Sequence, residues 1–263
     1  MNIIKDQMNR TLRLEGIPER IVSLVPSQTE FLHDIGLGDK VVGITKFCIH
    51  PDAWFRAKTR VGGTKKVNID KVLTLQPDLV IGNKEENTQS DIETLEKDVP
   101  VWMSDIFTLD DSLQMMSQLG VICDRQHEAT ALIDEVSRSF RQLQDMPQNK
   151  PLTALYLIWK NPYLAAAGNT FIDDMLQRCG FQNFLTGQNR YPEWIPDSKS
   201  VPDVILLSSE PYPFREKHIE ELQEIYPETR ILLVDGEMFS WYGSRLKYAA
   251  AYFMELRAQL GID

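Results

Sequence analysis

Apolar residues recur at intervals of three and four along residues 125–143, near the middle of the chain. The repeating positions are Ala129, Leu132, Ile133, Val136, Phe140 and Leu143. Charged and polar residues fill the gaps, which is typical of an amphipathic α-helix. Asp124 is a candidate N-cap, and Pro147 follows the end of the pattern. About 20 residues at about 1.5 Å each predict a helix of roughly 30 Å.

The N-terminal half alternates short apolar runs with helical patterns. We expect strands at residues 21–25, 41–44, 79–82 and 99–103, and helices at residues 69–75 and 91–97. A further helix should start at Ser27, where Ser27 and Glu30 have the spacing of a capping box, and end at Gly36. Asn68 is the candidate cap of the helix that follows it.

The C-terminal half repeats this alternation. We expect strands at residues 153–159, 203–207 and 230–234, and helices from Thr170 to Gly180 and at residues 217–225 and 244–260. The strand start Pro77-Asp78 is answered by Pro202-Asp203, and each strand is followed by a polar loop with a Glu, a helix and another strand. Strands that alternate with helices predict parallel sheets.

The predicted fold class is therefore α/β, with two Rossmann-like lobes whose parallel sheets are bridged by a single long α-helix. The expected parts are an N-terminal lobe at residues 1–107, linking helices at 108–150 and a C-terminal lobe at 151–263. The alternative is an ordinary amphipathic helix inside one domain.

Composition narrows the function classes. The chain has 263 residues, 43% of them hydrophobic, and a formal net charge of -10. An acidic chain is a poor partner for nucleic acid, and without a run of 18 apolar residues we expect no membrane-spanning segment. Three widely spaced cysteines predict neither a disulfide framework nor a zinc knuckle. The first residues lack a signal-peptide pattern, so we expect either a cytoplasmic protein or one whose export signal was removed.

Aromatic residues gather in the loops that should follow the strands, where open α/β sheets bind ligands. They include Phe47, Trp54, Trp159, Tyr163, Tyr191, Trp194, Tyr212, Trp241 and Tyr242. Aromatic loops favour a flat, partly apolar ligand surface. The alternative is that these rings seal the contact between the lobes.

Cys48 and His50 form a Cys-x-His pair, and the loops expected to face it carry Glu85, Glu86, Glu210 and Glu237. Such side chains suit zinc or a similar ion, although a Cys-x-His pair without partners at fixed spacing is usually incidental. The serines lack a G-x-S-x-G frame, and residues 62–65 lack phosphate-loop spacing, so we expect no catalytic residues. His33, His127 and His218 are expected to be structural or solvated.

Several stretches together resemble the helical-backbone substrate-binding proteins of ABC importers, of the vitamin B12 and ferric-siderophore receptor type. The matching stretches are residues 20–31 (RIVSLVPSQTEF), 41–45 (VVGIT), 68–81 (NIDKVLTLQPDLVI) and 202–207 (PDVILL). The resemblance implies two α/β lobes bridged by one long helix, with the ligand in the cleft between them.

Carried over by position, the resemblance places the ligand contacts in residues 47–50, 159–163, 191 and 237–242. Together with the residues singled out above, the predicted ligand-binding set is Phe47, Cys48, His50, Trp54, Glu85, Trp159, Tyr163, Tyr191, Glu237, Trp241 and Tyr242. The family also docks on a permease through one acidic residue on each lobe. Asp70 matches the first of these positions, and Asp197 is the candidate for the second, in a region that is shortened here.

These observations leave three functions open. The first is a binding protein that captures a cobalamin or other corrinoid, a haem or a ferric siderophore, without a required cofactor. The second is a direct metal-ion receptor of the same fold that uses Cys48, His50 and a Glu. The third is a cytoplasmic enzyme that acts on a metal chelate. The resemblance implies a periplasmic or membrane-associated location and an ABC permease as partner, and we expect a monomer.

Overall fold

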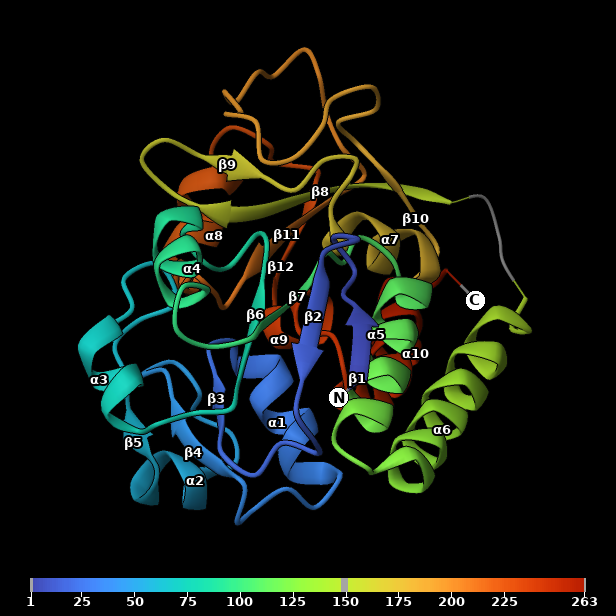
Figure 1. Ribbon diagram of the computed structural model, residues 1–263. Coiled ribbons are helices and arrows are strands. Elements are labelled where there is room, and N and C mark those ends of the chain that lie inside the picture. The colour runs from blue at the N-terminus through green and yellow to red at the C-terminus, as the bar shows by residue number, and fades with distance from the viewer. Residues whose placement is uncertain (1, 148–150, 263) are drawn as a thin grey trace. The chain divides into compact units, whose positions relative to one another are not determined.

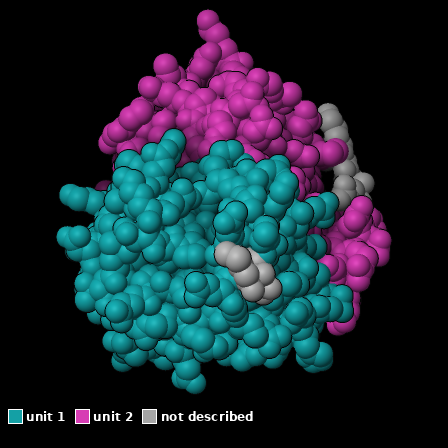
Figure 2. Space-filling view, viewed as in Figure 1, with its two compact units in different colours: residues 1–106, 110–135, 242–245 teal, residues 107–109, 136–241, 246–263 magenta. Residues whose placement is uncertain are grey.

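The chain divides into two compact units, which Figure 1 shows as ribbons and Figure 2 in separate colours. This computed structural model describes residues 2–147 and 151–262. Within them, unit 1 comprises residues 2–106, 110–135 and 242–245, and unit 2 comprises the remainder. The division falls inside α6 (Gln126–Gln144), so one continuous helix belongs to both units.

Unit 1 is built on a parallel sheet with the strand order β5-β4-β3-β6-β7. Its strands are β3 (Ile21–Ser23), β4 (Val41–Ile44), β5 (Thr59–Arg60), β6 (Leu79–Asn83) and β7 (Val101–Ser104). Its helices are α1 (Pro26–Asp34), α2 (Asp52–Ala57), α3 (Ile69–Thr74), α4 (Gln89–Leu95) and most of α5 (Leu109–Ile122). An antiparallel hairpin of β1 (Asn2–Lys5) and β2 (Thr11–Leu14) precedes the sheet.

Unit 2 is built on a second parallel sheet, with the order β10-β8-β11-β12 and a short antiparallel strand β9 beside β8. Its strands are β8 (Leu152–Trp159), β9 (Leu164–Ala165), β10 (Phe181–Asn183), β11 (Val204–Ser208) and β12 (Arg230–Val234). Its helices are α7 (Phe171–Arg178), α8 (Glu216–Gln223), α9 (Gly236–Ser240) and α10 (Leu246–Leu260).

The two sheets share one topology. When the two-residue strands β5 and β9 are left aside, the second strand of each sheet in chain order lies on one side of the first. The third and fourth lie on the other side, as β4-β3-β6-β7 and β10-β8-β11-β12. The Pro-Asp repeat marks the third strand of both. Asp78 accepts hydrogen bonds from the backbone N–H groups of Glu19 (2.8 Å) and Arg20 (2.9 Å), just before β3. Asp203 accepts bonds from the N–H and hydroxyl of Thr153, both at 2.7 Å, at the start of β8. The predicted α/β class with parallel sheets is confirmed.

The predicted cap at Asn68 is confirmed, and the helix predicted to start at Thr170 is capped by that residue. The Asn68 side chain accepts a hydrogen bond from the Lys71 N–H at the start of α3, and the Thr170 side chain accepts one from the Asp173 N–H at the start of α7. Such side chains satisfy N–H groups that the first helical turn leaves without partners.

The predicted cap at Ser27 is wrong. Helix α1 begins at Pro26, and Val25 is its N-cap, without a side-chain capping bond. Proline fits the first helical position because its fixed φ suits the helix and the N–H it lacks would have no partner there. Gly36, with φ 79°, follows the end of the helix as expected.

The central pattern at residues 125–143 forms the single helix α6, and α5 precedes it. Ala129, Val136, Phe140 and Leu143 of α6 are buried, as the periodicity predicts. A Cβ on Gly120 of α5 would lie 2.6 Å from the Cβ of Ala129, so these two helices pack closely at that point. Asp124 is not the N-cap: it has φ 55° in the turn between the helices, and the carbonyl of Arg125 accepts the first bond of α6, from Ala129.

Several short elements carry no pattern from which to predict them. The hairpin β1–β2, the strands β5, β9 and β10, and the helices α2 and α9 all span six residues or fewer, too few for a hydrophobic period to show. The elements β3, β4 and α3 are equally short, but β3 and β4 lie in apolar runs and α3 follows the cap residue Asn68. The long buried strands were found within a few residues of their ends, because both faces of a parallel sheet are covered and its strands read as apolar runs. None of the helices in the described chain is both long and apolar enough to cross a bilayer.

Candidate functional site

The loop after β4 carries the first group of predicted site residues. Phe47 is 49% exposed, and the Lys46 Nζ lies 4.9 Å from its ring centroid. Cys48 is fully buried, and its Sγ lies 3.1 Å from the hydroxyls of both Thr29 and Thr45. Burial raises the pKa of the Cys48 thiol above its usual value, so the thiol is protonated at neutral pH. Phe47 therefore offers a surface, whereas Cys48 ties the loop to α1.

The sequence suggested that Trp54 lies in a loop. It lies instead in α2, where it is buried. Its ring makes an edge contact with His33 of α1, with 5.2 Å between the centroids, and the Lys58 Nζ lies 5.2 Å from the ring. Packing between α1 and α2 accounts for this tryptophan. His50 is half-buried and directly precedes Pro51, the N-cap of α2.

The loop after β6 is held by a turn at Asn83. The Asn83 Oδ1 accepts hydrogen bonds from the N–H groups of Glu85 (2.8 Å) and Glu86 (3.0 Å), and both glutamates are half-buried. The Asn83 Nδ2 donates to the Ser104 hydroxyl at 2.9 Å, and the Gln28 Nε2 donates to the same hydroxyl at 2.5 Å. The carboxyl ends of β6 and β7 thus meet α1 in a buried polar network.

Residues 242–245 belong to unit 1, although they follow α9 of unit 2 in the chain. Arg245 makes two hydrogen bonds to the Glu30 carboxylate, at 2.6 and 2.8 Å. Tyr242 is buried, and burial raises the pKa of its phenol well above the usual value. The charges of Glu86 and Glu85 add to this rise, and hydrogen bonding to Ser27 and Ser104 opposes it. Tyr242 is therefore placed at the carboxyl end of the unit 1 sheet.

In unit 2, the most exposed predicted ring is that of Trp159, the last residue of β8, at 41% exposure. The Tyr212 ring makes an edge contact with it at 5.7 Å, and the Tyr212 hydroxyl lies 3.4 Å from the Nε2 of His218. His218 is buried, and its Nδ1 accepts a hydrogen bond from the Arg215 N–H at 2.9 Å. Trp159 is thus an exposed ring with a fixed support behind it.

The next loop places Tyr163 at the edge of a second aromatic group. Its ring makes an edge contact with Trp194 at 5.9 Å, and Trp194 stacks on Tyr226 at 6.0 Å. Tyr191 is half-buried, and the guanidinium of Arg190 lies 5.6 Å from its ring centroid. Trp194 has a packing role in the unit 2 core, while Tyr163 and Tyr191 retain accessible surface.

Trp241 and Glu237 belong to the short helix α9 and its C-terminal cap. The Asp235 side chain accepts a hydrogen bond from the Glu237 N–H at 3.0 Å and so caps this helix. Trp241 is buried, and its Nε1 donates to the Glu210 Oε1 at 2.8 Å. The Ser240 hydroxyl donates to the same oxygen at 2.6 Å. Glu210 therefore connects the loop after β11 with the end of α9.

The proposed metal ligands and docking residues have different surroundings. Among the residues that the structure describes, no cluster of three or more His, Cys, Asp or Glu side chains is placed to hold a metal ion. Asp70, in the first turn of α3, and Asp197 are both exposed. The Asp197 Oδ1 accepts a hydrogen bond from the Lys199 N–H at 2.9 Å.

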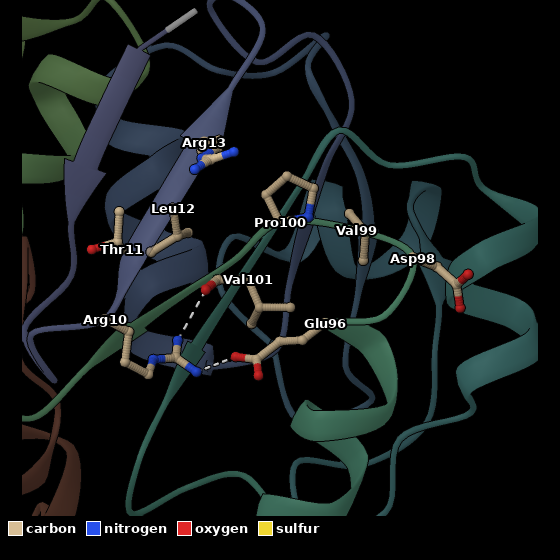
Figure 3. Close-up of a pocket in the computed structure, with 9 residues that line it drawn as sticks. All are labelled: Arg10, Thr11, Leu12, Arg13, Glu96, Asp98, Val99, Pro100 and Val101. Atoms are coloured by element: carbon tan, nitrogen blue, oxygen red, sulfur yellow. Dashed lines mark hydrogen bonds and ion pairs between the residues drawn. The ribbon is translucent and has the colours of Figure 1, made fainter.

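Two surface cavities lie elsewhere. One, of about 450 Å³, lies between the hairpin and β7, with Arg10 bonded to Glu96 and to the Val101 carbonyl at its wall (Figure 3). The other, of about 480 Å³, lies along β10 in unit 2. None of the described residues that line these two cavities belongs to the predicted ligand-binding set.

The sequence suggested Glu210 only as one of four glutamates that could bind a metal, and it did not assign His218 or Gln28 to the site. One signal for Glu210 is present in the repeat: Pro77, Asp78, Asn83 and Glu85 are matched at a constant offset by Pro202, Asp203, Ser208 and Glu210. The hydrogen bonds of His218 and Gln28 join segments that no local pattern connects.

Comparison with known proteins decides the family. A family model described as "Periplasmic binding protein" matches residues 21–225, more than half of the chain. The chain belongs to the periplasmic binding protein family. A vitamin B12-binding protein of Vibrio vulnificus (strain CMCP6) is 28% identical over 74% of this chain and 71% of its own length.

Solved structures of periplasmic binding proteins share the fold. The periplasmic vitamin B12 binding protein of Vibrio cholerae is 21% identical, with a TM-score of 0.76 over 92% of this chain and 99% of its own. A periplasmic heme binding protein from Pseudomonas aeruginosa is 22% identical, with a TM-score of 0.78 over 91% and 92%. The predicted resemblance and fold class are therefore confirmed. This family consists of binding proteins rather than enzymes.

Proposed function

We propose that this periplasmic binding protein is the substrate-binding component of an ABC-type importer and binds a metal-centred chelate, with cobalamin first, then haem or a ferric siderophore. The named function of the relatives supports this order. The observation that carries the proposal is the exposed ring of Trp159 at the carboxyl end of β8, which packs in an edge contact with Tyr212. A flat conjugated ligand buries such a ring without needing a charged partner.

The predicted contacts come from the loops at the carboxyl ends of both sheets. Phe47 and Tyr242 belong to unit 1, and Trp159, Tyr163, Tyr191 and Trp241 belong to unit 2. Direct metal binding by Cys48 is not favoured, because its buried thiol already contacts two threonine hydroxyls and burial raises its pKa. The proposal therefore needs no cofactor, and the metal arrives within the ligand.

The test is to titrate the purified chain separately with cyanocobalamin, haemin and a ferric hydroxamate. Calorimetry and visible absorbance measure the binding of each probe. We expect saturable one-to-one binding of at least one probe. Trp159→Ala and Phe47→Ala should each weaken it about 10-fold, which corresponds to about 1.4 kcal/mol, because truncating a well-packed aromatic contact costs more than about 1 kcal/mol. Tyr248→Ala is the matched control, since Tyr248 is 53% exposed on α10. Absence of binding to all three probes would refute the proposal.

Docking on a permease and a location outside the cytoplasm are part of the same proposal. Asp70 is exposed in the first turn of α3, and Asp197 is exposed in unit 2, so both carboxylates are accessible to arginines of a partner. Asp70→Asn and Asp197→Asn should leave ligand affinity unchanged and weaken association with the permease. Asp98→Asn, at another exposed position, is the control. Fractionation of cells that carry the native gene tests the location, and light scattering tests the proposed monomer of 30.3 kDa.

A further inference from the structure

Glu210 presents its carboxylate to the end of a helix rather than to solvent. Its Oε1 accepts two hydrogen bonds, from the Trp241 Nε1 at 2.8 Å and from the Ser240 hydroxyl at 2.6 Å. Trp241 is the C-cap residue of α9. An indole N–H is a donor only, so an acceptor at this position fixes the direction in which the ring lies.

The loop that carries Glu210 is itself held on both sides. The Ser208 hydroxyl accepts the Glu210 N–H at 3.2 Å and donates to the Glu210 carbonyl at 2.5 Å. The Tyr156 hydroxyl of β8 donates to the same Ser208 Oγ at 3.2 Å. Glu210 is therefore attached to a strand-end turn that has little freedom to move.

Helix α9 packs tightly against this turn. The Gly236 N–H donates to the Ser209 hydroxyl at 2.9 Å. A Cβ on Gly236 would lie 2.3 Å from the Ser208 Oγ and 2.7 Å from the Glu210 Cγ, so only glycine fits. The turn thus contacts both ends of α9. It contacts Gly236 at the first end, and Glu210 accepts hydrogen bonds from Ser240 and Trp241 at the last.

We propose that Glu210 is the positioning residue for Trp241 in ligand binding, holding the indole through its Nε1–H so that the ring is in place before the ligand arrives. The inference rests on the proposed function, in which Trp241 contacts the chelate. Preorganised side chains raise affinity because no rotamer freedom is lost on binding.

The Glu210 carboxylate lies in surroundings that disfavour its negative charge, and its two hydrogen-bond donors offset that effect. Burial is the main cause that raises the pKa of Glu210, and the charges of Glu237 and Asp235 add to it. The hydrogen bonds from Ser240 and Trp241 act in the opposite direction. A neutral amide would keep an oxygen acceptor without the repulsion from Glu237 and Asp235, so Glu210→Gln should preserve the position of the indole.

The first test is a double-mutant cycle with cyanocobalamin, or with haemin if cyanocobalamin does not bind. We expect Glu210→Ala to weaken binding about 10-fold, which corresponds to about 1.4 kcal/mol, while Glu210→Gln stays within about 3-fold of the natural chain. In the Trp241→Phe background, Glu210→Ala should have no further effect, because residues that act through one contact are not additive. Glu224→Ala, at an exposed position, is the control. Unchanged affinity in Glu210→Ala, or additive losses, would overturn the proposal.

The second test needs no ligand. The chain has five tryptophans, and ¹⁵N-labelling gives an indole N–H signal for each, of which the one lost in Trp241→Phe is that of Trp241. We expect this signal to move upfield in Glu210→Ala and to return towards its place in Glu210→Gln. An unmoved signal in Glu210→Ala overturns the positioning role. If no probe binds but the signal moves as expected, the proposed function fails and the hydrogen bond to Trp241 stands.

Discussion

The loops after β6 and β11 occupy the same place in the two sheets but are stabilised in different ways. In both, the last strand residue accepts a hydrogen bond from the N–H two residues further on: Asn83 from Glu85 at 2.8 Å, and Ser208 from Glu210 at 3.2 Å. Side chains of this kind form local turns with their own backbone. The turn is therefore a property of the repeat.

Beyond the turn, the two loops diverge. Asn83 continues into a buried polar network with Ser104, which also accepts a bond from Gln28 of α1. Glu210 instead directs its carboxylate to Ser240 and Trp241. The shared fold supplies a rigid strand end in each unit, and the side chains beyond it decide which ring or loop is held there.

A second difference lies one residue earlier, where Gly82 of β6 is matched by Leu207 of β11. A Cβ on Gly82 would lie 2.7 Å from both the Asn87 Oδ1 and the Met103 Sδ. The Asn87 Oδ1 is fixed because it accepts the Asn83 N–H at 2.8 Å. Unit 1 therefore has no side chain at Gly82, where the polar network fills the space, whereas Leu207 at the matching position is part of the unit 2 core.

The largest expected effect tests whether β6 and β11 contribute equally to the stability of the hydrophobic cores of their units. Ile81 and Leu206 occupy matching positions and are both fully buried. Ile81→Ala and Leu206→Ala should each lower the free energy of unfolding by about 2–5 kcal/mol, because each leaves a cavity in a packed core. Urea denaturation followed by circular dichroism measures the loss, and hydrogen exchange shows which sheet is loosened. Val121→Ala, 58% exposed on α5, is the apolar control. A loss below about 1 kcal/mol at either site would break the equivalence.

A smaller effect tests the aspartate that ties the third strand to the first. Asp78→Ala and Asp203→Ala each remove two charge-assisted hydrogen bonds, to the residues before β3 and at the start of β8. Both carboxylates are exposed, so we expect each substitution to cost about 1–2 kcal/mol rather than the full strength of buried bonds. Thermal unfolding is the measurement, with Asp98→Ala as the exposed control. If only one of the two substitutions destabilises the protein, the repeated Pro-Asp sequence does not make the same contribution to stability in both units.

Much of the fold could be predicted because its causes are local. Buried parallel strands read as apolar runs, and Asn68 and Thr170 bond to N–H groups three residues away. Where two local causes competed, the prediction failed: Ser27 and Glu30 have capping-box spacing, yet Pro26 takes the first helical position. Asp124 could not be placed because its left-handed turn depends on how α5 packs against α6.

The candidate site could be predicted only in its ring-bearing loops. Aromatic residues in loops are visible in the sequence, and the rings of Phe47 and Trp159 are exposed, as a ligand surface requires; their contact with a ligand stays a prediction. Trp54 shows the limit: its neighbours in sequence suggested a loop, but α2 buries it against His33. The supports of the rings come from segments far along the chain, as Glu210 does for Trp241. Such long-range bonds have no period or motif from which to predict them.

The smallest expected effect concerns the buried His218 of unit 2, whose ring contacts Tyr212, the neighbour of Trp159. Burial is the main cause that lowers the pKa of His218 below 6.5, and the positive charges of Lys160 and Lys217 act in the same direction, against the attraction of Glu221. Well above pH 6.5 the imidazole is neutral in both the folded and the unfolded chain and does not change stability. As the pH falls below 6.5, the unfolded chain takes up a proton first, so unfolding becomes more favourable until the folded pKa is passed.

The measurement is the free energy of unfolding between pH 7 and pH 5, for the natural chain and for His218→Gln. We expect the natural chain to lose stability over this range and His218→Gln to show a shallower slope. The ion pair of Lys160 with Glu221 lowers the pKa of Glu221 below 4.5, so its contribution is lost only at more acidic pH and does not confuse the result. His127→Gln, at an exposed position of α6, controls for the substitution itself. Equal slopes in the natural chain and His218→Gln would mean that the ring behind Tyr212 takes up its proton equally well in the folded and unfolded chains.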